Sequence, residues 1–188
     1  PIYILDIHST SQPVAPFWVY PNFARNARAA LALGALGRVG THLVMPSGLG
    51  SGTPLIQHGR HGLDGDDAGV ALVVECGQHF LRASAELATA TALDFLAHFG
   101  LIEPAPRGVS AAPQRRFELL QTCMVHTPDF KFARPLIGFE TFAEGELIAT
   151  DGDAGEIRAP CDDCTVLMPA REPIVGREAV YLTRPIRD

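Results

Sequence analysis

The stretch IYILDIHST, residues 2–10, is apolar apart from Asp6 and His8 and ends in small polar residues. Near-continuous apolar runs are typical of buried parallel strands, and open α/β sheets bind ligands just beyond the carboxyl ends of such strands. Because side chains alternate along a strand, Asp6 and His8 leave the same face, and Asp6 could orient the imidazole of a metal-binding His8. The alternative is that His8 is a hydrogen-bonded structural histidine.

A second apolar run, residues 69–74, leads directly to Glu75. A carboxylate in this position is costly to bury unless it is paired, hydrogen-bonded or functional. If the two runs form neighbouring parallel strands, Glu75 and His8 open onto the same crevice. Metal-assisted hydrolysis needs this arrangement, because a metal acidifies water and a nearby carboxylate carries its proton. The alternative is that Glu75 caps the next helix.

Five short motifs, in order along nearly the whole chain, resemble the succinylglutamate desuccinylase/aspartoacylase family. They are LDIHST (5–10), VECGQ (74–78) followed by LRA (81–83), ALDFLAHF (92–99), DCTV (163–166) and EAVY (178–181). The resemblance implies a zinc-carboxypeptidase-like fold and an enzyme that removes acyl groups from N-acyl amino acids. Position by position, it implies that His8 is the third zinc ligand, Glu75 the general base and acid, and Tyr181 a substrate contact.

The family takes its first two zinc ligands from an upstream His-x-x-Glu motif, which this sequence lacks. We therefore expect the chain to be the C-terminal part of a longer enzyme, with those ligands outside it. His58 and His61 form a His-x-x-His pair in a Gly-rich loop, where solvated imidazoles are expected. Arg60, between them, is the candidate for binding substrate or stabilising an oxyanion.

The fold class expected is α/β, part of a zinc-carboxypeptidase-like mixed sheet with flanking helices, followed by a small all-β domain. Residues 1–103 would be the C-terminal half of the catalytic domain, 104–113 a Pro-rich linker and 114–188 the small β domain. Arg25 and Arg28 should form a solvated stripe on a helix beginning at residue 23. The pattern predicts other elements: a strand at 41–45, a loop at 48–69, a helix from Ser84 to Gly100, strands at 117–125, 135–139, 146–150, 156–159 and 165–168, and a turn at 151–155.

Composition and charge exclude some classes of function. The chain is 47% hydrophobic, enough to bury a core, but no apolar run is long enough to span a membrane. Its net charge of −6, without a Lys/Arg cluster, argues against nucleic-acid binding. Four cysteines without framework spacing indicate free thiols in the cytoplasm.

These features favour a zinc-dependent amidohydrolase acting on a small-molecule N-acyl amino acid, with Zn²⁺ as cofactor and the formation of a homo-oligomer left open. A metallocarboxypeptidase-like peptidase and a metal-free binding module that keeps the fold remain as alternatives.

Overall fold

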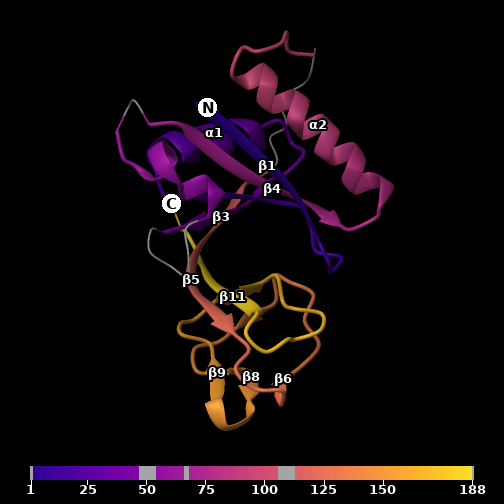
Figure 1. Ribbon diagram of the computed structural model, residues 1–188, viewed down its shortest axis with the longest axis vertical. Coiled ribbons are helices and arrows are strands. Elements are labelled where there is room, and N and C mark those ends of the chain that lie inside the picture. The colour runs from indigo at the N-terminus through magenta and orange to yellow at the C-terminus, as the bar shows by residue number, and fades with distance from the viewer. Residues whose placement is uncertain (1, 47–53, 66–67, 106–112, 188) are drawn as a thin grey trace. The chain divides into compact units, whose positions relative to one another are not determined.

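The structure is a computed structural model that describes residues 2–46, 54–65, 68–105 and 113–187. The chain divides into two compact units (Figure 1). The first comprises Pro1–Thr10 and Ala15–Arg116, and the second comprises Ser11–Val14 and Phe117–Asp188. The candidate residues Asp6, His8 and Glu75 all belong to the first unit.

The first unit is built on a mixed sheet with the strand order β1-β4-β2-β3. β1 (Tyr3–Thr10) runs parallel to β4 (Val70–Gln78), and β2 (Phe17–Pro21) runs parallel to β3 (Thr41–Met45). β2 and β4 are antiparallel, which makes the sheet mixed. The fold class expected from the sequence is therefore confirmed.

Two helices cover one face of this sheet (Figure 1). α1 (Ala24–Gly34) packs on β2 and β4, while α2 (Arg82–His98) packs on β1 and β4 and also contacts α1. α2 begins after Leu81, and Ser84 lies inside it, where its hydroxyl donates to the Gln78 carbonyl. The prediction that Ser84 begins this helix is therefore wrong, because its hydroxyl bonds the preceding strand instead of the helix's first amides.

β2, which the sequence reading missed, forms the strand-helix-strand unit with α1 and β3. Its residues are all buried, so no polar alternation marks it as a strand. Between β3 and β4 the described residues form two short 3₁₀ helices, η1 (Leu55–Gln57) and η2 (Gly59–Gly62). The rest of the predicted loop, residues 48–53 and 66–67, lies outside the described residues.

The second unit is all-β in its described residues. One set of antiparallel neighbours has the order β5-β11-β10-β7, and a separate small sheet has the order β6-β8-β9. The strands are β5 (Arg115–Met124), β6 (Phe130–Phe132), β7 (Thr141–Phe142), β8 (Leu147–Asp151), β9 (Glu156–Arg158), β10 (Cys164–Leu167) and β11 (Glu178–Pro185). η3 (Gly152–Ala154) makes the turn expected at residues 151–155.

The strand predicted at residues 135–139 is wrong. The amides of Ile137 and Gly138 donate to the Glu140 carboxylate, and Phe139 has a φ of 71°, outside the extended region. These local bonds satisfy the amides that a strand would direct to its neighbours. The chain there is a turn that leads into β7.

Candidate active site

The parallel pairing of β1 and β4 places His8 directly opposite Glu75. Asp6 lies two residues before His8, on the same face of β1. Tyr3, which alternates to the other face, stacks on Phe99 at the end of α2. Asp6, His8 and Glu75 therefore project from the face of the sheet opposite the two helices, toward the carboxyl ends of the parallel pair.

The imidazole of His8 lies between two carboxylates. Its Nε2 is 3.1 Å from Oδ1 of Asp6, and its Nδ1 is 3.6 Å from Oε1 of Glu75, which is longer than a hydrogen bond. The side chain of His8 is 49% exposed, that of Asp6 30% and that of Glu75 5%. The group thus opens to solvent at His8 and has a buried carboxylate at its base.

Burial raises the pKa of Glu75, and Asp6 adds to the rise while His8 opposes it. The second oxygen, Oε2, is buried without a hydrogen-bond partner among the described residues. Glu75 lies inside β4, opposite Phe17 of β2, and α2 starts only after Leu81. It is therefore not the helix cap that the sequence left as an alternative, and burying this carboxylate costs free energy.

The strand ends beyond the site are joined by contacts that the sequence reading missed. The Oγ of Ser9 lies 2.8 Å from Nδ1 of His79, and the amide of His79 donates to the Thr10 carbonyl. These bonds connect β1 to the residues that follow β4, close to His8 and Glu75 along both strands. The sequence could have indicated them only through the strand register, which pairs Thr10 with Gln78.

The other residues singled out in the sequence lie elsewhere. Arg60 is exposed on η2, and Tyr181 lies on β11 of the second unit, where its hydroxyl donates to Glu178. Their roles in substrate binding remain predictions. His58 is exposed, but His61 is buried and its ring lies against Gly69, just before β4. The expectation of two solvated imidazoles is therefore wrong for His61.

The donor set fits part of a zinc site. Imidazole nitrogen and carboxylate oxygen are both zinc ligands, and catalytic zinc takes three protein ligands. Asp6 contacts Nε2 of His8, which leaves Nδ1 as the nitrogen that could bind a metal. Within the described ranges no group of three or more His, Cys, Asp or Glu side chains is arranged to hold a metal ion. These residues therefore fit one ligand and a neighbouring base.

No family model and no curated protein matches this sequence. Solved structures do match. Succinylglutamate desuccinylase from Vibrio cholerae aligns with a TM-score of 0.70 at 18% identity, covering 97% of this chain and 53% of its own. The enzyme from Vibrio parahaemolyticus aligns with a TM-score of 0.66 at 19% identity, covering 97% of this chain and 53% of its own. The succinylglutamate desuccinylase/aspartoacylase from Rhodobacter sphaeroides aligns with a TM-score of 0.63 at 20% identity, covering 100% of this chain and 59% of its own.

The chain therefore has the fold of the succinylglutamate desuccinylase/aspartoacylase structures, as the sequence motifs led us to expect. It spans a little more than half the length of each of these three proteins. Across the described residues, no helix combines the length and apolar character needed to cross a membrane.

Proposed function

We propose that this chain is part of a zinc-dependent hydrolase that removes the acyl group from an N-acyl amino acid. The observation that carries the proposal is the placement of His8 opposite Glu75 at neighbouring parallel strands, with Asp6 against the imidazole. The fold shared with proteins named as desuccinylases and aspartoacylases supports this class of amide hydrolysis. A structural, hydrogen-bonded His8 does not account for the buried Glu75, whose Oε2 has no hydrogen-bond partner among the described residues.

In this proposal His8 would hold zinc through Nδ1, while Asp6 orients the ring through its contact with Nε2. Bound zinc would supply Lewis acidity toward the acyl carbonyl and toward water. Glu75 accepts the proton of the attacking water and returns it to the leaving amine. Arg60 is proposed to bind the substrate or stabilise the oxyanion, and Tyr181 is proposed to contact the substrate.

Two further zinc ligands are needed, and we propose that they come from sequence outside these 188 residues. The four cysteines are free thiols, which supports the proposal that the protein works in the reducing cytoplasm.

The test is Glu75→Gln in the full-length, zinc-loaded enzyme. The substitution keeps the side chain's size and removes its proton-carrying role, so turnover of N-acyl amino acids should fall by roughly two to four orders of magnitude. Zinc content and melting temperature should stay near wild type. Glu103→Gln, at an exposed glutamate, is the matched control and should keep full turnover. Near wild-type turnover in the Glu75→Gln enzyme would remove Glu75 from the mechanism.

Metal content and substrate range separate the alternatives. His8→Ala should lower retained zinc together with activity, because one ligand is lost. Unchanged zinc in this variant would show that His8 is not a ligand. A wild-type enzyme that cleaves peptides but not N-acyl amino acids would favour the peptidase, and a zinc-free protein without turnover would favour the binding module.

A further inference from the structure

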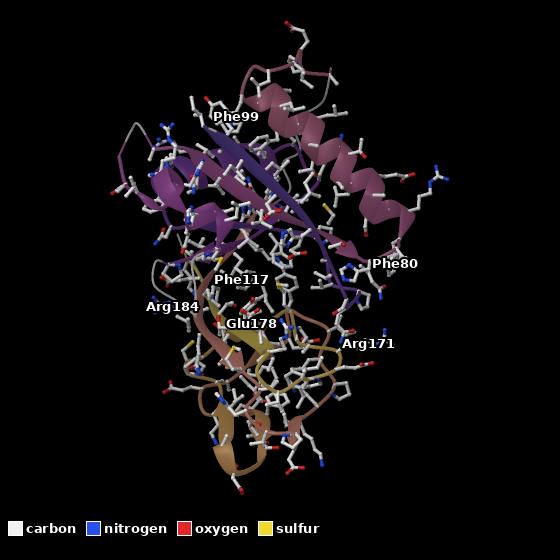
Figure 2. All side chains as sticks on the ribbon, viewed as in Figure 1. Phe80, Phe99, Phe117, Arg171, Glu178 and Arg184 are labelled. Carbon is white, nitrogen blue, oxygen red and sulfur yellow. The ribbon has the colours of Figure 1, made fainter. Side chains whose placement is uncertain are left out.

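A cavity of about 340 Å³ opens at the other end of the parallel pair. Its lining includes Tyr3 and Val70, the first residues of β1 and β4, Arg28 of α1, and His98 and Phe99 at the end of α2. Figure 2 shows Phe99 at this end of α2, beside the start of β1. Every lining residue belongs to the first unit.

This cavity is separate from the candidate active site. Tyr3 pairs with Val70, whereas His8 pairs with Glu75 five residues further along, a distance of roughly 16 Å at the usual rise of a strand. The cavity lies on the helix-covered face, and His8 and Glu75 project from the opposite face. A ligand in the cavity would therefore not contact the residues of the proposed reaction.

One wall of the cavity is aromatic. The rings of Tyr3 and Phe99 stack with centroids 3.9 Å apart and an interplanar angle of 23°. The His98 ring meets Phe99 edge to face at 4.8 Å. Tyr3 remains partly accessible to solvent, because the residue is 39% exposed. A flat apolar group could pack against this wall.

Another part of the cavity lining is cationic. Arg25 is held in place because its guanidinium donates to the carbonyls of Gly69, His61 and Leu63, at 3.0, 3.1 and 2.6 Å. Its side chain is only 11% exposed, so the solvated stripe expected from the sequence is wrong for Arg25. Its one ion-pair partner in the described part of the chain is Asp64, at 3.9 Å.

Arg28 follows on the same side of α1, and it is exposed and has no hydrogen bond or ion pair in the described residues. The first turn of α1 contains no acidic residue to offset this charge. Arg28 therefore gives the cavity lining a positive charge that can pair with a bound anion.

We propose that this cavity binds a small aromatic carboxylate. The ring packs against Tyr3 and Phe99, and the carboxylate accepts hydrogen bonds from the guanidinium of Arg28. The volume lies at the small end of the range for ligand pockets, which suits a molecule of one ring and a short acidic arm.

Phenylacetate titrated into the full-length protein, followed by calorimetry, tests the proposal. Benzyl alcohol probes the ring alone and inorganic phosphate the charge alone. Arg28→Gln should weaken phenylacetate binding by about tenfold, the loss expected for one charge-assisted hydrogen bond. Arg171→Gln, at an exposed arginine of the second unit (labelled in Figure 2), is the matched control and should bind as wild type does. Both probes should bind much more weakly than phenylacetate.

A carboxylate could also bind a zinc ion, so His8→Ala is measured in parallel. Phenylacetate binding that survives His8→Ala and weakens in Arg28→Gln supports the cavity. Binding lost in His8→Ala but unchanged in Arg28→Gln would place the ligand at the active site and overturn the proposal. The absence of phenylacetate binding, or equal binding of phosphate, would also overturn it.

Discussion

The stability of the first unit should fall in mild acid because of His42. This residue lies on β3, is fully buried, and its Nε2 is 2.7 Å from Oε1 of Gln114. Since an amide oxygen only accepts, Nε2 carries the hydrogen of the neutral ring. Nδ1 is buried with no hydrogen-bond partner among the described residues, so a second proton would be placed there unpaired. Gly34 makes room for this pair, because a Cβ there would come 2.2 Å from the Gln114 oxygen.

Burial lowers the pKa of His42 from 6.5 to about 4, with Arg116 adding to the fall and the Gln114 hydrogen bond opposing it. The unfolded chain therefore binds more protons than the folded chain between these two values. The contribution of neutral His42 to the free energy of unfolding is fully present above the pKa of the unfolded chain. It is lost as the pH falls toward the pKa of the folded chain. Between about pH 7 and about pH 4.5 the loss should be roughly 2–3 kcal/mol.

Trp18 provides the assay. It is the only tryptophan of the chain, is buried, and pairs with His42 across β2 and β3. Urea unfolding followed by its fluorescence therefore reports the unit that contains His42. The free energy of unfolding is measured near pH 7 and near pH 4.5 for wild type, for His42→Gln, and for His58→Gln at an exposed histidine as the matched control.

Wild type and His58→Gln should lose roughly 2–3 kcal/mol more than His42→Gln over this pH range, whatever the stability of His42→Gln at neutral pH. Because only the change with pH is compared, a general loss of packing in the variant does not affect the result. Equal pH dependence in wild type and His42→Gln would refute the reasoning and show that His42 titrates normally.

Two further stability predictions use the same fluorescence assay. Arg25→Met should destabilise the first unit by about 2–4 kcal/mol, because the carbonyls of Gly69, His61 and Leu63 lose a charged donor. Arg28→Met, on the same helix, should change stability by less than about 0.5 kcal/mol, and equal losses in the two variants would contradict the anchoring role of Arg25. Gly69→Ala should cost about 1–3 kcal/mol, because its Cβ would lie 2.4 Å from the His61 ring and 2.6 Å from the Ile2 carbonyl. An unchanged urea midpoint in this variant would show that the close packing at Gly69 is not needed.

Local patterns in the sequence predict much of the architecture. The strand at residues 41–45 matches β3, and the helix beginning at residue 23 matches α1 within one residue at its start. In the second unit, β5, β8, β9 and β10 each lie within two residues of the predicted strands. These elements are bounded by clear turn residues, so short-range information is enough.

β2 and β11 were not predicted as strands. Each has one neighbouring strand close in sequence and another more than fifty residues away, because Phe17 pairs with Glu75 and Tyr181 with Thr122. The burial of all of β2 also removes the alternation by which a strand is recognised. Long-range pairing of this kind leaves little trace in a short window of sequence.

The sequence by itself determined that Asp6 and His8 share a face of a strand and that Glu75 ends an apolar run, because both follow from the two-residue period of a strand. Only the tertiary structure decided that His8 meets Glu75, since the register between β1 and β4 depends on packing across the whole sheet. Tertiary packing likewise decided that the Arg25 guanidinium donates hydrogen bonds to three carbonyls, whereas Arg28 on the same helix is exposed to solvent. A charge pattern places both arginines on one side of a helix, but which of them is desolvated depends on the carbonyls that a distant loop brings to it.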